Sequence, residues 1–334
     1  MIVVTPDRMT EIMLATWEAN TTHMLIGPPA TAKTSIPKQV AEKKGVPWKV
    51  LNPVTSDPVD LRGYPQIKDG LTTWVRPDFL PVDGEGVFII DEAGQGTRAM
   101  QAALMALVFT REVAGHKIGD GWRMVLTTNR VTDRAAVNAM PSPLKSRLMQ
   151  WEITCSPSAW LKWAGREKLH PQVISFIIAN EELLNTFDPE QDQQVYACPR
   201  TWHMLSNVLK VTGTDDDKLV HQIAGSLVGD GPAEMFAAFQ TVKHLLPKMS
   251  AILDGTAPAL DQPSAINAVT SYMKVAIVEN PDAFREPFAK YIAQFPPEWA
   301  ANAIGEMLTV DTDFTNAKEL ETWMNAHSEQ LLRA

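Results

Sequence analysis

The most informative segment of this sequence is His23-Met-Leu-Ile-Gly27-Pro-Pro-Ala-Thr-Ala-Lys33-Thr34-Ser35. A short apolar run comes first, a stretch of small residues and prolines follows, and a helix-compatible stretch begins after it. This order of strand, loop and helix is the context in which a P-loop binds phosphate groups. The context makes the segment a stronger signal than the motif letters alone.

Each part of the loop suits phosphate binding. Backbone N–H groups point into a concavity at a helix amino terminus, where the helix dipole favours negative charge. Lys33 can reach the β- and γ-phosphates, and the Thr34 hydroxyl can bind Mg²⁺. We therefore predict that the residues holding the nucleotide are Gly27, Pro28, Pro29, Ala30, Thr31, Ala32, Lys33, Thr34 and Ser35.

Ala32 departs from the motif GxxxxGK[ST], because it stands at the position of the second glycine. A methyl group at this place lies close to the phosphates and narrows the allowed backbone conformations. Alanine is the smallest side chain that could replace the glycine. The alternative interpretation is an ordinary strand-to-helix turn in which Lys33 and Thr34 are adjacent by coincidence.

A second apolar run, Val87 to Ile90, ends in the acids Asp91 and Glu92. Ligands of open parallel sheets bind at the carboxyl ends of the strands, so both acids are expected near the phosphates. We expect Asp91 to accept a hydrogen bond from a Mg²⁺-bound water and Glu92 to polarise the attacking water as general base. The alternative is a pair of solvated acids at the start of the next helix.

Apolar runs alternate with helix-like stretches up to about Ile153, which predicts an α/β domain with a parallel sheet flanked by helices. Several runs are apolar at every position, as expected for strands covered on both faces. The predicted strands are His23 to Ile26, Trp48 to Leu51, Val87 to Ile90, Met124 to Thr127 and Met149 to Ile153.

Beyond Cys155 the strand signal stops and apolar residues recur at helical spacing. We therefore predict an α/β core over residues 1–154, with an insert at about 56–81, and an all-helical region over residues 155–334. The Gly and Pro content of the segment Asp57 to Pro81 is typical of loops and hairpins.

Composition limits the classes of function. A net charge of −9 over 334 residues argues against a protein that binds nucleic acid through a basic surface. The two cysteines, Cys155 and Cys198, lack the spacing of a zinc site or redox pair and suit a reducing compartment. The amino terminus lacks the apolar core of a signal peptide, and no apolar stretch is long enough to cross a bilayer. We expect a cytoplasmic, soluble protein.

A third apolar strand pattern starts at Met124 and ends at Asn129, which we expect beside Glu92. Taken with the two earlier motifs, the sequence resembles AAA+ ATPases, and within them the MoxR type. The signature of that type includes GPPGTAKT, a DE pair followed by a Gln-containing helix, a strand ending in Asn, and an arginine finger. Ala is frequent in that family at the position of Ala32, whereas Ala30 replaces a glycine that is usual there.

The resemblance implies roles for residues that chemistry alone would not select. Gln101 corresponds to the helix glutamine, and Asn129 to the sensor-1 residue. Arg200, in Pro199-Arg200-Thr201-Trp202, resembles the sensor-2 arginine of a lid domain. The segment Asp57 to Pro81 looks like the insert that decorates the family's ring.

Arg147, in Pro143-Leu-Lys-Ser-Arg147, corresponds by resemblance to the arginine finger. Such a guanidinium stabilises charge at the γ-phosphate of a neighbouring subunit, so hydrolysis would depend on assembly. Arg130 and Arg134 compete for the same role. Without the resemblance, Arg147 would be interpreted as a surface residue at a helix end.

The resemblance implies a Mg²⁺-dependent ATPase with ATP and Mg²⁺ as cofactors, working as a homo-oligomer, most often a hexameric ring. Its hydrolysis would remodel or activate a partner protein, often one with a von Willebrand A-like domain. One alternative is a nucleotide-dependent assembly or binding module with weak hydrolysis. Another is a subunit of a nucleic-acid motor, against which stand the acidic charge and the lack of a DNA-binding motif.

Overall fold

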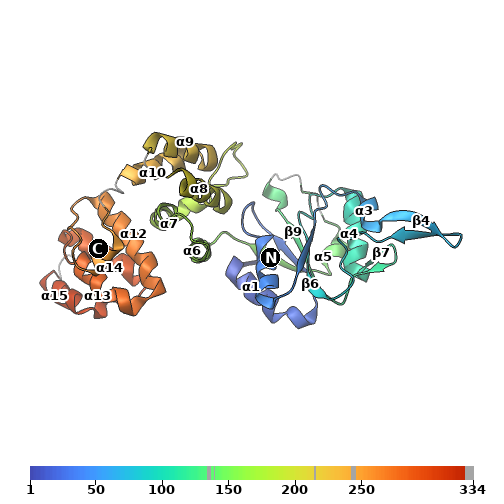
Figure 1. Ribbon diagram of the computed structural model, residues 1–334, viewed down its shortest axis with the longest axis horizontal. Helices are drawn as coiled ribbons and strands as arrows, with labels where there is room; N and C mark the ends of the chain where they lie inside the picture. Colours follow the sequence, from blue (N-terminus) through green and yellow to red (C-terminus); the bar gives the residue numbers. More distant parts are fainter. Residues whose placement is uncertain (134–136, 139, 214–215, 242–245, 328–334) are drawn as a thin grey trace. The chain divides into compact units, whose positions relative to one another are not determined.

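The computed structural model of the chain describes residues 1–133, 137–138, 140–213, 216–241 and 246–327. The chain forms two compact units. One comprises Met1–Ala159 and Phe187–Asp192, and is called here the sheet unit. The other comprises Trp160–Thr186 and Gln193–Ala334, and is called the helical unit (Figure 1).

A six-stranded parallel sheet forms the centre of the sheet unit. Every predicted strand is present, and β1 is an additional edge strand. β1 has three residues, of which two are exposed. So short a strand shows no pattern of apolar residues from which it could be predicted. In spatial order the strands are β1 (Ile2–Val4), β10 (Met149–Ile153), β2 (His23–Ile26), β9 (Gly121–Thr128), β6 (Glu85–Ile90) and β3 (Trp48–Leu51).

Helices cover both faces of this sheet (Figure 1), which explains the uninterrupted apolar runs. Along β6, Val87 and Ile89 belong to an apolar cluster with α1 (Pro6–Ala15) and α2 (Ser35–Lys44). The alternate residues Phe88 and Ile90 belong to a cluster on the other face with α4 (Arg98–Thr110) and α5 (Ser142–Lys145). The predicted parallel α/β fold is therefore confirmed.

The segment after β3 contains the short helix α3 (Pro58–Arg62) and a hairpin of β4 (Tyr64–Lys68) and β5 (Leu71–Val75). Asp69 and Gly70 form its turn with φ of 54° and 76°, as expected for an Asp-Gly two-residue hairpin. Figure 1 shows this hairpin extending away from the sheet. A second, smaller hairpin joins β7 (Glu112–Val113) to β8 (His116–Lys117).

The described part of the helical unit consists of helices and connecting segments, as predicted. Several helices start with proline, whose fixed φ and missing N–H suit the first helical turn. The helices are α6 (Pro157–Arg166), α7 (Pro171–Ala179), α8 (Pro199–Thr212), α9 (Asp217–Val228), α10 (Asp230–Thr241), α11 (Met249–Leu253), α12 (Pro263–Glu279), α13 (Pro281–Ile292), α14 (Pro297–Leu308) and α15 (Lys318–Ala326).

Aromatic packing fixes the first helices of this unit, where Phe176 of α7 contacts both Trp202 of α8 and Phe236 of α10. A separate apolar cluster joins α11 through α15. There Arg285 forms a two-pronged ion pair with the buried Asp311. Within the described residues, we find no helix with the length and apolar character needed to cross a membrane.

Candidate active site

The loop after β2 begins at Gly27, a position that only glycine can occupy. A Cβ on Gly27 would lie 2.4 Å from the carbonyl oxygen of Ile153, at the end of the neighbouring strand β10. Gly27 N–H donates to the carbonyl of Thr128 on the opposite neighbour β9. The loop is therefore clamped between two strands, and Ser35 begins α2 directly after it.

Two alanines in this loop adopt left-handed backbone conformations, with φ of 62° at Ala30 and 65° at Ala32. For a residue with a Cβ this conformation costs roughly 1–2 kcal/mol relative to right-handed backbone. These are the two positions at which the motif or the resembling family has glycine. The loop therefore keeps a glycine-like path despite its alanines, and such turns direct successive N–H groups into an anion-binding concavity.

Lys33 connects the loop to the end of β9, the strand that pairs with β2 in the sheet. Its ammonium donates to the backbone carbonyls of Gly27 and Pro28 at 2.9 and 2.6 Å. It also donates to Asn129 Oδ1 at 2.9 Å, directly after the end of β9. The structure therefore brings together the predicted phosphate-binding lysine and the predicted sensor asparagine.

Thr34 and Asp91 also meet, because the Thr34 hydroxyl donates to Asp91 Oδ1 at 2.7 Å. Asp91 is held at the end of β6 by its own N–H, which donates to Leu51 O of β3. A hydroxyl and a carboxylate are hard oxygen donors of the kind that Mg²⁺ selects. The two predicted metal-binding residues therefore fit the ion in both chemistry and proximity.

Thr127 is a member of the site that sequence reasoning missed. Its hydroxyl donates to Asp91 Oδ1 and accepts a hydrogen bond from Glu92 N–H at 3.0 Å. The side chain is only 1% exposed. A hydroxyl at the end of an otherwise apolar buried strand was the available signal, since a buried polar group needs a partner.

Glu92 has a left-handed backbone, with φ of 59°, and an exposed side chain. Non-glycine residues in this conformation concentrate at functional sites, where the surrounding structure imposes the strain. Here the Glu92 N–H bond to Thr127 and the Ala93 N–H bond to Thr127 O hold the turn. The backbone therefore turns directly after Asp91, the candidate metal ligand, and Glu92 lies within this turn.

The three candidate finger arginines differ in their surroundings. Arg147 is exposed after α5, where Nη1 donates to Pro143 O and the guanidinium lies 3.8 Å from the ring centroid of Phe109. Arg130 instead forms ion pairs with the buried Asp133 and with Glu152. The hydrogen bond to Asp133 raises the pKa of Arg130 above its usual value. Arg134 lies outside the described residues.

Arg200 lies in the first turn of α8 in the helical unit, directly after Pro199, and is exposed. The Cys198 N–H is capped by the Thr201 hydroxyl at 2.9 Å. The first turn of α8 is therefore well defined, and Arg200 projects from it.

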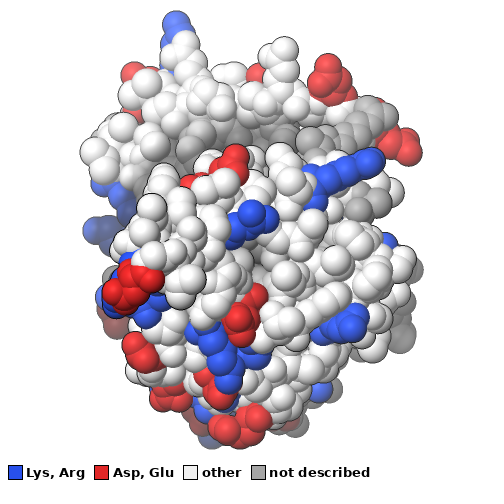
Figure 2. Space-filling view, turned by 90° about the vertical axis from the view of Figure 1, so that its right-hand side faces the viewer, with Lys and Arg blue, Asp and Glu red and all other residues white. Residues whose placement is uncertain are grey.

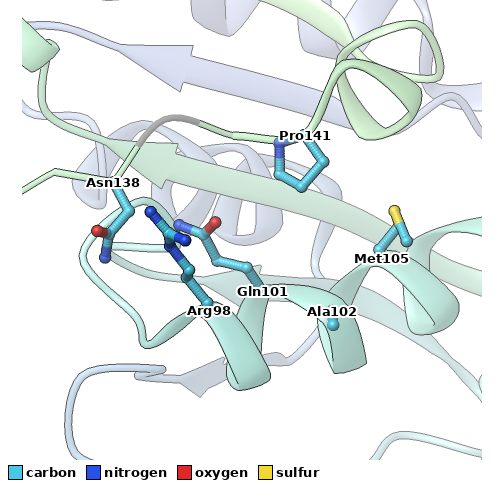
Figure 3. Close-up of a pocket in the computed structure, with 6 residues that line it drawn as sticks. All are labelled: Arg98, Gln101, Ala102, Met105, Asn138 and Pro141. Carbon is cyan, nitrogen blue, oxygen red and sulfur yellow. The ribbon is translucent and has the colours of Figure 1, made fainter.

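Gln101 is buried in α4 and donates from Nε2 to Gly94 O, in the segment that follows the two acids. It borders a cavity of about 270 Å³ between α4 and the segment before α5. Figure 3 shows polar ends of Arg98, Gln101 and Asn138 at one side of this cavity. The cavity is lined by Arg98, Gln101, Ala102, Met105, Asn138 and Pro141.

Charges of both signs lie on the face of the molecule that Figure 2 draws. On the face in Figure 2, basic and acidic side chains are interspersed among larger uncharged areas. Among the described residues on this face, basic side chains do not gather into one continuous patch of the kind that neutralises phosphates.

Comparison with known proteins gives no match to a protein-family model and none to a curated protein. The search of solved structures gives alignments that span most of this chain at low identity. NtrX from Brucella abortus in complex with ADP is 13% identical, with a TM-score of 0.40, covering 96% of this chain and 68% of that one. The Thermotoga maritima RuvB Holliday junction branch migration motor is 12% identical, with a TM-score of 0.34, covering 96% of this chain and 86% of that one.

Proposed function

We propose that this chain is a Mg²⁺-dependent ATPase of the AAA+ class and MoxR type, which hydrolyses ATP in a ring of identical subunits to remodel or activate a partner protein. The observation that carries the proposal is the meeting of Lys33, Thr34, Asp91 and Asn129 at the carboxyl ends of β2, β6 and β9. In parallel sheets this edge is where ligands bind.

The residues of the loop would hold the phosphates through backbone N–H groups, with Lys33 neutralising charge on the β- and γ-phosphates. Thr34 and Asp91 would hold Mg²⁺, which supplies further neutralisation of the phosphate oxygens. Glu92, whose side chain is exposed, is suited to orient and deprotonate the attacking water. Asn129 would contact the γ-phosphate from the end of β9.

Arg147 is the finger in this proposal. Its contacts leave most guanidinium N–H groups without a protein acceptor among the described residues, whereas Arg130 is engaged by Asp133 and Glu152. An exposed arginine can reach a neighbouring subunit's γ-phosphate, so the active site would be completed by assembly. A hexamer closed by head-to-tail contacts is the expected ring.

The two parts of the chain that the sequence predicts would have different roles in this proposal. Residues 1–154 would be the nucleotide-binding core, with the hairpin segment at about 56–81 as its insert. Residues 155–334 would be a helical lid with a carboxyl-terminal extension, in which Arg200 would act as the sensor-2 residue. The partner protein would carry a von Willebrand A-like domain.

The decisive test is the ATPase rate against protein concentration with Mg²⁺, measured together with the light-scattering mass with and without a slowly hydrolysed ATP analogue. We expect the specific rate to rise steeply as a ring forms, because Arg147 acts across the interface. Arg147→Ala should lower hydrolysis roughly a thousandfold while nucleotide affinity stays close to wild type.

Mixed rings provide the control. Arg147→Ala subunits have an intact loop, and Glu92→Gln subunits have an intact Arg147, so mixing the two should restore part of the activity. Nucleotide-dependent assembly with negligible turnover would instead indicate a binding module. Absence of nucleotide binding would contradict the proposal as a whole.

A further inference from the structure

The contact between Arg147 and Phe109 joins two elements that are distant in the sequence. Phe109 lies in the last turn of α4, and Arg147 follows α5. The guanidinium carbon of Arg147 is 3.8 Å from the centroid of the Phe109 ring. That separation is well within the range of about 6 Å over which a cation is attracted to an aromatic face.

Packing against neighbouring apolar side chains restrains the Phe109 ring that makes this contact. The ring is partly buried and packs against the apolar cluster between α4 and the sheet. A second constraint comes from Arg147 Nη1, which donates to Pro143 O at 3.1 Å. An exposed arginine, which would otherwise sample many rotamers, is thus held at two points on two different helices.

The contact with the ring leaves the N–H donors of the Arg147 guanidinium available for hydrogen bonds to other groups. The guanidinium carbon lies over the ring, and the N–H donors point outward from that carbon in the guanidinium plane. Stacking therefore orients the cation without using its hydrogen bonds to phosphate oxygens. Arg130 shows the opposite arrangement, because carboxylates of Asp133 and Glu152 occupy its edge.

We propose that Phe109 is a positioning residue for Arg147, which holds the guanidinium ready for the γ-phosphate of the neighbouring subunit. The inference rests on the proposed function, because it requires Arg147 to act as the finger. Phe109 would favour the ion pair that Arg147 forms with a phosphate across a subunit interface. Phe109 itself would touch neither nucleotide nor water.

The first experiment compares Phe109→Leu, which keeps an apolar side chain but removes the aromatic face, with Phe109→Tyr, which keeps the face. We expect Phe109→Leu to lower kcat about two- to fivefold, the value of an exposed cation–π contact, with KM for ATP unchanged. Phe109→Tyr should retain kcat. Phe79→Leu is the matched control, because Phe79 is a partly buried ring on the same cluster.

The second experiment separates positioning from folding. In rings with an excess of Glu92→Gln subunits, most Phe109→Leu subunits receive an intact Arg147–Phe109 pair from the neighbour. Their rate per active site should return to the rate of wild-type subunits diluted in the same way. A defect in the fold of the Phe109→Leu subunit would remain in these rings, and that result would overturn the inference.

The outcomes for the two proposals are distinct. If Arg147→Ala loses hydrolysis but Phe109→Leu keeps the wild-type kcat, the positioning role is wrong and the finger assignment stands. If Arg147→Ala keeps full hydrolysis, both are wrong. If Phe79→Leu lowers kcat as much as Phe109→Leu, general loosening of the cluster explains the effect, and the positioning role is again wrong.

Discussion

Lys33 and Asn129 are 96 positions apart in the chain, yet Lys33 Nζ donates to Asn129 Oδ1 at 2.9 Å. The bond exists because β2 pairs directly with β9, with Ile26 opposite Thr128. The strand order therefore places the end of one strand beside the loop that follows the other. A γ-phosphate bound by Lys33 would lie within reach of Asn129, and this relationship underlies the first prediction.

Replacing Lys33 by alanine should weaken ATP binding about 100-fold or more, because a charged donor to the phosphates is lost. Titration with a fluorescent ATP analogue measures the change. Asn129→Ala should bind ATP more tightly than Lys33→Ala but hydrolyse it more slowly than wild type. Lys43→Ala, at an exposed lysine near the end of the helix α2 that follows the loop, serves as the control. Equal binding by Lys33→Ala and Lys43→Ala would refute the phosphate site.

Glu92→Gln should retain nucleotide binding and lose about 10²- to 10⁴-fold in turnover, because glutamine cannot accept the proton of the attacking water. Single-turnover hydrolysis gives the rate of the chemical step. Glu85→Gln removes one negative charge in the same way at the exposed start of β6, the strand that precedes Glu92, and it should have wild-type turnover. Normal turnover in Glu92→Gln would end its assignment as general base.

Thr127→Val should destabilise the sheet unit by roughly 1–3 kcal/mol, because Glu92 N–H loses its acceptor while the side-chain shape is kept. It should also raise the Mg²⁺ concentration needed for half-maximal hydrolysis, since the Asp91 carboxylate loses a donor that orients it. Thr127→Ser retains the hydroxyl and should lie near wild type in both. Equal Mg²⁺ dependence of the valine and serine variants would exclude this role.

Ala30→Gly and Ala32→Gly should each stabilise the protein by about 1 kcal/mol, because glycine adopts the left-handed backbone without steric cost. Denaturant unfolding measures the change. The control is Ala106→Gly on the exposed side of α4, which should destabilise by about 0.5–1 kcal/mol, as glycine does inside a helix. Destabilisation by all three substitutions would show that the loop backbone is not strained.

His23 provides a pH-dependent prediction. The Trp151 indole N–H can only donate, so His23 Nδ1 accepts from it and Nε2 carries the proton toward Thr16 Oγ1. Burial lowers the pKa of His23 from the usual 6.5 of a histidine to about 4. Protonation of His23 would place an N–H on Nδ1, facing the N–H of the Trp151 indole, and would break the hydrogen bond between them. The folded protein therefore favours the neutral imidazole.

The sign of the pH dependence follows from this shift. Because the folded-state pKa lies below the unfolded value, the unfolded chain binds the proton first as pH falls. The contribution of His23 to stability is present above about pH 6.5 and is lost between pH 6.5 and pH 4, by on the order of 3 kcal/mol in total. Unfolding of His23→Gln should be less pH-dependent than wild type in this window.

Much of the sheet could be predicted because its signals are local. Val87 to Ile90 is apolar at each position since helices cover both faces of β6, and that requirement is written into the segment itself. β1 escaped prediction because three mostly exposed residues carry no periodicity. The left-handed conformations of Ala30 and Ala32 also escaped prediction, since the residue types alone do not specify φ.

By itself, the sequence determined the order of strand, loop and helix around Gly27 and the placing of acids after β6, because these depend on neighbours along the chain. Only the tertiary structure decided that Lys33 meets Asn129, that Thr127 supports Asp91, and that Arg147 stacks on Phe109. Each of those contacts depends on which strands and helices become neighbours in space. That choice comes from burying apolar faces over the whole domain, and no single segment of the chain encodes it.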